Sequence, residues 1–124
     1  MSQSREDYVK FMFEHGGEGA ITNKMIADGL NVSPASVSEM MQKLAREGLV
    51  KTQRYRGSEL TESGYQMAQE LVRIHEIWEY FLEQKLGYSK EEVHNFAEVL
   101  EHATPIELAD RLARFIEFPE NQVI

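Results

Sequence analysis

The chain contains no cysteine, and this absence excludes disulfide bonds and thiolate metal sites. It also lacks an apolar run long enough to span a membrane, and its polar start, MSQSREDY, does not form a secretory signal pattern. We therefore expect a cytoplasmic protein without a membrane-bound part. Its length of 124 residues is typical of one compact domain or two small ones.

Positive charge is scarce, with 13 Lys and Arg against 21 Asp and Glu, so a surface wholly devoted to nucleic acid is excluded. The charge is unevenly spread, however, because residues 22–56 hold six basic and three acidic residues. A basic segment beside a strongly acidic remainder favours two tasks, one facing phosphates and one facing cations. The alternative that both charge blocks are only solvated surface stays open at this point.

The apolar periodicity predicts a mainly α-helical fold with one small β-hairpin. We expect helices over residues 4–15, 23–29, 34–47, 63–87, 90–102 and 105–115, and a hairpin over residues 49–61. The expected domain organisation is a first domain over residues 1–62, with three helices and the hairpin, followed by a helical domain over residues 63–124.

Capping residues support most of these helix starts. Thr22 and Ser33 are N-cap candidates, and Pro34 fits the first helical position. Ser89 with Glu92 has the spacing of a capping box. For the last helix we expect Thr104 as the N-cap, Pro105 in the first turn and Glu107 as the capping-box partner of Thr104.

The first half of the chain predicts a DNA-reading module, because helix, short helix, tight turn, helix and hairpin follow one another in winged helix-turn-helix order. The second helix of such a pair carries small polar residues at its N-terminal end, which lets it enter the major groove. Candidate DNA contacts are Pro34, Ala35, Ser36, Ser38, Lys43, Arg46, Arg54, Tyr55 and Arg56. One module offers little surface, so we expect a homodimer on double-stranded operator DNA. An ordinary three-helix bundle with solvated lysines is the alternative.

The second half predicts a metal site on one face of a helix. At about 100° per residue, His94, Glu98, Glu101 and His102 fall in one sector roughly 100° wide. Carboxylates held this close repel one another unless a cation or a proton lies between them. Mixed carboxylate and imidazole ligands suit manganese, ferrous iron, zinc or cobalt. His75 and Glu79 form a further i, i+4 pair, although such pairs are also common on wet surfaces.

Two alternatives of other kinds remain. A di-iron four-helix enzyme needs Glu-x-x-His on two helices. Here the residue three places after Glu98 is Glu101, His102 falls one place late, and no second helix carries a copy. The second alternative is a winged-helix regulator that is controlled by a small organic ligand or a protein partner. In that case the carboxylates are merely solvated. Calorimetry with Mn(II) separates the second alternative from a metal-controlled regulator.

The segments EDYVKFMFE, NVSPASVSEMMQKLAREGLV, YRGSELTESG, LVRIHEIWEYFL and AEVLEHATP, in this order, resemble the diphtheria-toxin-repressor family of metal-dependent transcriptional regulators. The manganese-responsive branch is the most similar. The resemblance implies a repressor of metal-uptake genes that binds a palindromic operator as a dimer when Mn(II), or alternatively Fe(II), is bound. Zn(II), Co(II) and Cd(II) are expected to bind in vitro.

Carried over by position, the resemblance implies a main regulatory site of Asp7, Glu98, Glu101 and His102, with His75 as a ligand in a two-metal arrangement. The neighbouring site of the iron-type members maps to His75, Glu79 and His94. Glu98 stands where the iron-type members have cysteine, which favours manganese over softer metals.

Two departures from the family pattern matter. Lys10 occupies the position of a glutamate in the two-metal relatives, and a charged lysine cannot be a ligand. This leaves open whether one or two metal ions bind. Many relatives also continue past the equivalent of residue 119 into a small SH3-like or FeoA-like domain, so the sequence leaves open whether such a domain has been lost or never existed.

Overall fold

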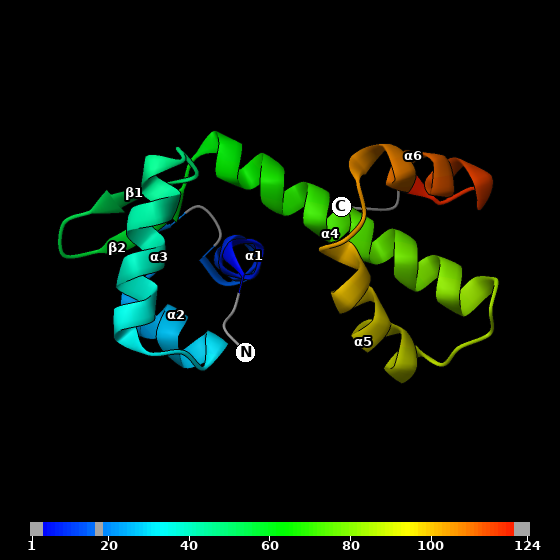
Figure 1. Cartoon of the computed structure of the whole chain (residues 1–124), viewed down its shortest axis with the longest axis horizontal. Coiled ribbons are helices and arrows are strands. Elements are labelled where there is room, and N and C mark those ends of the chain that lie inside the picture. The colour runs from blue at the N-terminus through cyan, green and yellow to red at the C-terminus, as the bar shows by residue number, and fades with distance from the viewer. Residues whose placement is uncertain (1–3, 17–18, 121–124) are drawn as a thin grey trace. The chain divides into compact units, whose positions relative to one another are not determined.

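The computed structural model describes residues 4–16 and 19–120, and in this part of the chain it is mainly helical (Figure 1). The elements are α1 (Arg5–Gly16), α2 (Asn23–Leu30), α3 (Pro34–Arg46), β1 (Val50–Gln53), β2 (Gly57–Leu60), α4 (Glu62–Gln84), α5 (Lys90–Glu101) and α6 (Ile106–Phe115). This series confirms the predicted fold class. None of the described helices combines the length and the apolar character that crossing a membrane requires.

The chain forms two compact units, Met1–Gln69 and Glu70–Ile124. The division falls within α4, whereas the sequence predicts a domain boundary between residues 62 and 63, at the start of that helix. The predicted boundary stays a prediction, because compactness and evolutionary domain limits are different properties. Each unit is described by itself below.

Local capping determines the helix-turn-helix of the N-terminal unit. The Thr22 hydroxyl accepts a hydrogen bond from the Met25 amide at 3.1 Å, and the Ser33 hydroxyl accepts one from the Ser36 amide at 3.1 Å. Asn31, with φ of 57°, ends α2 in the left-handed conformation that asparagine tolerates. Both predicted caps are therefore confirmed, and they hold α2 and α3 on either side of a short turn.

The predicted end of α2 near Gly29 is one residue early, because the helix continues to Leu30. Gly29 has a packing role instead of a capping role: a Cβ atom there would collide with the ring of Phe11 on α1. The glycine allows α1 and α2 to approach closely.

The hairpin is anchored to the core of the same unit. β1 and β2 are antiparallel with Val50 opposite Leu60, and Ile21 exchanges two backbone hydrogen bonds with Ser58, at 2.8 and 2.9 Å. Apolar side chains from α1, α2, α3 and the hairpin form the core, among them Val9, Met12, Ile26, Val37, Leu44 and Leu60. The hairpin tip projects beyond α3 (Figure 1). This arrangement leaves the outer face of α3 and the tip accessible.

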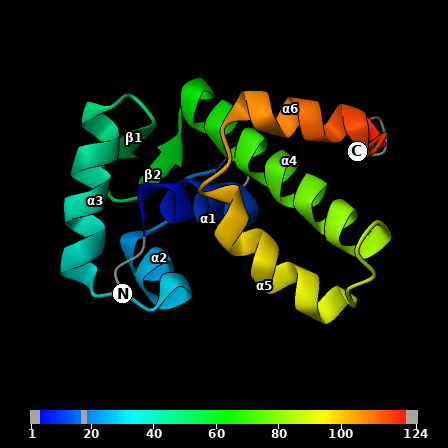
Figure 2. The same cartoon turned by 45° about the vertical axis from the view of Figure 1, so that its right-hand side comes forward.

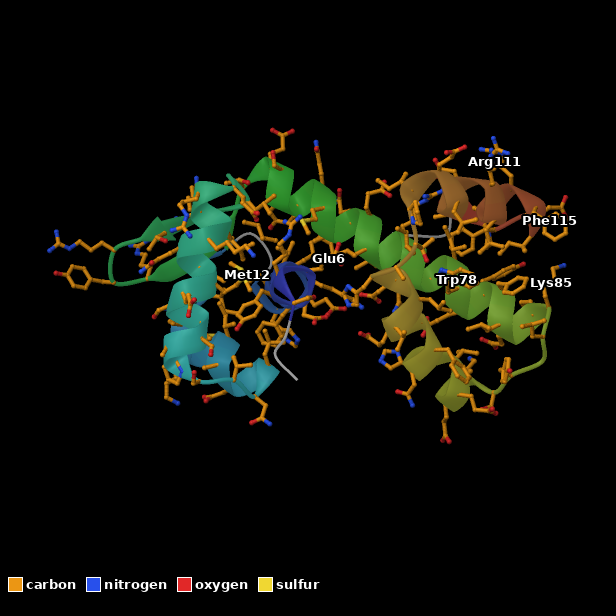
Figure 3. The ribbon with its side chains drawn as sticks, in the orientation of Figure 1. Glu6, Met12, Trp78, Lys85, Arg111 and Phe115 are labelled. Atoms are coloured by element: carbon orange, nitrogen blue, oxygen red, sulfur yellow. The ribbon has the colours of Figure 1, made fainter. Side chains whose placement is uncertain are left out.

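The C-terminal unit packs two helices against the second part of α4. In Figures 1 and 2, α5 and α6 lie on opposite sides of that part of α4. Ile74 and Ile77 of α4 pack with Ala109, Ala113 and Ile116 of the α6 region. Figure 3 shows Arg111 and Phe115 projecting outward from α6. The other side of α4 is thereby available to α5.

An ionic cluster fastens the end of the described chain to α4. The Arg73 guanidinium donates to Asp110 Oδ1 at 2.9 Å and to Glu120 Oε1 at 2.6 Å. The hydrogen bond to Glu120 is the main cause that raises the pKa of Arg73, which therefore stays charged. A planar guanidinium suits two carboxylate partners at once.

The predicted start of the last helix is wrong in its details. Pro105, not Thr104, is the N-cap residue of α6, and it makes no side-chain cap. The Thr104 hydroxyl instead donates to the Leu100 carbonyl at 2.6 Å and accepts from Trp78 Nε1 at 2.8 Å. A part-buried indole N–H favours an acceptor within the protein, and this tertiary contact outweighs the local cap.

Replacing Thr104 with valine is expected to destabilise the protein by about 1–3 kcal/mol, because the isosteric side chain leaves the Trp78 N–H without its acceptor. Urea unfolding followed by tryptophan fluorescence measures the change. Thr104→Ser keeps the hydroxyl and should recover most of the stability. Equal losses in the two variants would show that the methyl group, not the hydrogen bond, is what matters.

Candidate metal centre and nucleic-acid interface

All predicted metal ligands except Asp7 lie in the C-terminal unit, on α4, on α5 and at the C-terminal end of α5. α4 carries His75 and Glu79, whereas α5 carries His94, Glu98 and Glu101, and His102 is the C-cap of α5. Two groups of three hold ligand atoms within 4.8 Å of one another. We call His75, Glu98 and Glu101 the inner triad, and His75, Glu79 and His94 the outer triad.

The inner triad is built around a buried carboxylate. The side chain of Glu101 is fully buried, with an exposed fraction of 0%, and its Oε1 lies 2.6 Å from His75 Nδ1. Glu98 Oε1 lies 3.8 Å from the same nitrogen. A carboxylate taken out of water needs a proton, a hydrogen-bond donor or a cation nearby. The buried carboxylate of Glu101 therefore suits either a hydrogen bond from His75 or a divalent ion held by the inner triad.

The outer triad lies closer to solvent. His75 Nε2 is 3.0 Å from Glu79 Oε2, and His94 Nδ1 is 3.4 Å from the same oxygen. The His94 side chain is 60% exposed, and its other nitrogen lies 3.6 Å from Glu98 Oε1. Two imidazoles and a carboxylate form a donor set that manganese, iron and zinc accept.

The remaining predicted ligands have local partners. His102 Nε2 lies 3.6 Å from Glu101 Oε2, so each Glu101 oxygen faces a different imidazole. Asp7, in the N-terminal unit, accepts hydrogen bonds from the amide and the hydroxyl of Ser4 at 3.0 Å, in the first turn of α1. Its membership of the metal site stays a prediction. Lys10, on the same helix, is a buried lysine, with an exposed fraction of 7%.

The predicted DNA-contact residues are all exposed, and they belong to α3 and to the hairpin. On α3 the buried side chains Val37, Met41 and Leu44 face the core, which leaves the opposite face outward. The exposed set comprises Pro34, Ala35, Ser36, Ser38, Lys43, Arg46, Arg54, Tyr55 and Arg56. The sequence prediction omitted Lys51, whose side chain is 64% exposed beside Glu59 on the hairpin. Its place in the basic segment was the signal that could have identified it.

The hairpin tip contains a strained residue. Tyr55 has φ of 67°, a left-handed conformation that costs a non-glycine residue about 1–2 kcal/mol. Its side chain is 91% exposed, and the Arg54 guanidinium lies 5.2 Å from its ring centroid. Since no core packing compensates for the strain, the exposed ring and the adjacent cation fit a contact surface for DNA.

We expect Tyr55→Gly to keep or raise the stability by up to about 1 kcal/mol, because glycine adopts the left-handed conformation freely. Operator affinity should fall by about threefold or more, because the ring next to Arg54 is lost. Thermal unfolding and fluorescence anisotropy with labelled DNA measure the two effects. Unchanged DNA affinity would mean that the ring makes no contact with DNA.

Comparison with known proteins connects both halves to one family. Residues 1–58 match the iron-dependent repressor N-terminal DNA-binding domain, and residues 61–122 match the iron-dependent repressor metal-binding and dimerisation domain. The transcriptional regulator MntR of Lysinibacillus sphaericus is 32% identical over 120 residues, which cover 94% of this chain and 84% of that protein.

Solved structures agree with these matches. The manganese regulator SloR matches 96% of this chain with a TM-score of 0.80 and 39% identity. ScaR with bound Zn²⁺ matches 94% of this chain with a TM-score of 0.85 and 41% identity. The chain spans only 56% and 55% of the lengths of those two chains. The family consists of transcriptional regulators, so the enzyme alternative is set aside. With one family model on each half, the chain belongs to the iron-dependent repressor family of metal-dependent transcriptional regulators, the family that its sequence resembles.

Proposed function

We propose that the chain is a Mn(II)-responsive repressor that binds a palindromic DNA operator as a homodimer in the cytoplasm when its metal site is loaded. The observation that carries this proposal is the inner triad, where a fully buried carboxylate, Glu101, lies within 2.6 Å of an imidazole and close to a second carboxylate. Fe(II) is the alternative physiological metal, and Zn(II), Co(II) or Cd(II) are expected to bind in vitro.

The donor chemistry supports manganese. The inner triad offers carboxylate oxygens and one imidazole, and the chain has no cysteine that could supply a thiolate. Hard oxygen donors suit Mn(II) better than they suit soft metals, although zinc binds more tightly to most such sites. The relatives support the same choice, since SloR is described as a manganese regulator and ScaR as a manganese-activated repressor. ScaR was also solved with Zn²⁺ and with Cd²⁺.

The residues suggest how metal binding controls DNA binding. A bound divalent ion supplies positive charge that offsets the carboxylates of the triads. We keep Asp7 in the proposed ligand set, because the family resemblance implies a metal ligand at this position. A preference of a few kcal/mol for the DNA-binding arrangement is enough to change occupancy by orders of magnitude.

The homodimer is supported by exposed apolar side chains in the unit that matches the dimerisation domain. Phe96 and Val99 on α5 are 46% and 72% exposed. The apolar residues that the sequence suggests for dimer contacts are Trp78, Phe81, Val93, Phe96 and Leu100. Val93 is buried within its own unit. Phe96 is therefore the better candidate for a partner contact.

The test is an operator titration with and without metal. Duplexes selected from a random DNA library in the presence of Mn(II) serve as the operator, and fluorescence anisotropy measures affinity. Mn(II) should raise the affinity by well over about tenfold, or about 1.4 kcal/mol, and EDTA should reverse the gain. DNA binding that is indifferent to EDTA, with calorimetric Mn(II) affinity no tighter than roughly millimolar, would favour control by an organic ligand or a protein partner.

A further inference from the structure

The basic segment, residues 22–56, contains three acidic side chains, and two of them have a basic partner. Asp28 pairs with Lys24 at 3.1 Å, and Glu47 pairs with Arg5 at 3.2 Å. For the carboxylate of Glu39, the described residues 4–16 and 19–120 supply neither a hydrogen bond nor an ion pair. Glu39 is therefore the acid of this segment whose charge the described chain leaves uncompensated.

Glu39 lies on the face of α3 that points away from the core. With Val37 as zero and about 100° per residue, the other buried side chains of α3 fall within roughly 40° of it. Glu39 falls at about 200°, opposite this buried stripe, and it is exposed. The basic side chain of Arg46 shares its direction, at about 180°. The carboxylate thus lies in the middle of the surface that α3 offers to DNA.

A carboxylate on this face lowers the affinity for most DNA sequences. Phosphate oxygens repel it, and so do the acceptors of the major groove, which are guanine O6 and N7, adenine N7 and thymine O4. Two groups donate there, the N4 amino group of cytosine and the N6 amino group of adenine. The adenine N6 group lies beside N7, and this pair suits an amide better than a carboxylate. Cytosine is therefore the base that offers a carboxylate a donor without an acceptor on the same base.

We propose that Glu39 reads a cytosine: its carboxylate accepts a hydrogen bond from the N4 amino group in the major groove of each operator half-site. The same charge disfavours duplexes with another base at this position, so Glu39 determines specificity partly by lowering the affinity for wrong sequences. This inference rests on the proposed operator binding and names one base pair that each half-site contains. It adds an acidic residue to a set of predicted DNA contacts that are all neutral or basic.

Glu39→Gln tests this assignment, because glutamine keeps the length of the side chain and removes the charge. Its amide can also donate to adenine N7 while it accepts from N6, the bidentate pairing that favours adenine. Selection from a random duplex library with Mn(II) gives the operator of the wild-type chain. Fluorescence anisotropy with Mn(II) then measures duplexes in which each C·G pair is replaced by A·T in both half-sites.

At one such pair the wild-type chain should prefer cytosine over adenine by about tenfold in affinity. In Glu39→Gln this preference should fall to about twofold or below, while the preferences at the other positions stay as they are. Glu91→Gln is the control, since it removes the same charge from an exposed position in the C-terminal unit. Its base preferences should equal those of the wild-type chain. Glutamine and glutamate favour helices about equally, so both variants should fold and keep the calorimetric Mn(II) affinity.

Two results would overturn the proposal. One is a wild-type operator whose half-sites contain no C·G pair, and the other is a Glu39→Gln variant that keeps the wild-type preference at every C·G pair. If the wild-type chain with Mn(II) selects no DNA sequence at all, the proposed function itself fails. The failure of the base assignment is therefore distinguishable from the failure of operator binding.

Discussion

Glu101→Gln is expected to abolish most of the Mn(II)-induced gain in operator affinity, a loss of about tenfold or more, equivalent to about 1.4 kcal/mol. Glu101 presents one oxygen to His75 and the other to His102, at 2.6 and 3.6 Å, and its side chain is fully buried. Glutamine preserves the volume but removes the negative charge that a divalent ion needs. The remaining carboxylate of the inner triad, Glu98, is half-exposed and gives weaker binding by itself.

The measurement is operator anisotropy at a saturating and at a zero Mn(II) concentration, together with calorimetric Mn(II) affinity. Glu91→Gln is the matched control, since Glu91 is an exposed glutamate on the same helix. It removes the same charge from the chain, so general electrostatic repulsion of DNA changes equally. A full Mn(II) response in Glu101→Gln, equal to that of Glu91→Gln, would rule out Glu101 as a ligand.

The sequence predicts helices well where their ends depend on neighbouring residues. Thr22, Ser33 and Ser89 cap the helices that follow them, as their local patterns indicate. These contacts span three residues, so tertiary packing has little influence on them. The hairpin is predictable for the same reason, since its turn and its strands are adjacent in the chain.

The prediction fails where a distant residue competes for the same group. Thr104 is a reasonable cap for α6 by its neighbours, but Trp78, 26 residues earlier, takes its hydroxyl as an acceptor. Gly29 similarly reads as a helix stop, yet its lack of a side chain serves the packing of Phe11. Neither partner is visible from a pattern of local residues.

The candidate site divides in the same way. Helical periodicity brings His94, Glu98 and Glu101 to one face of a helix without any tertiary information. The proximity of His75 to Glu101 requires α4 and α5 to pack in one particular register, and periodicity does not contain that register. Only the family resemblance put His75 beside this cluster beforehand, and it left two assignments for that residue. The two ring nitrogens of His75 face different carboxylates, and only the fold reveals this arrangement.

The largest effect on DNA binding is expected from Ser38→Glu in α3, which should lower operator affinity by about 100-fold or more at saturating Mn(II), because it places a carboxylate against phosphates and base edges. Ser38 is exposed on the outward face of α3, near the N-terminal end of the helix. Its hydroxyl accepts a long hydrogen bond, at 3.4 Å, from the Asn23 amide of α2. A glutamate in the first half of a helix is compatible with the helix dipole, so the fold should be preserved.

Ser63→Glu is the control, because Ser63 is an exposed serine in the first turn of another helix, α4. Both variants add the same charge to the chain, so any difference between their operator affinities reports the position of the charge and not its presence. Calorimetric Mn(II) affinity should be unchanged in both variants, which separates DNA reading from metal sensing. Equal affinities of the two variants for the operator would mean that α3 does not face DNA. The winged helix-turn-helix would then bind a protein partner instead of DNA, because exposed basic residues by themselves fit either kind of partner.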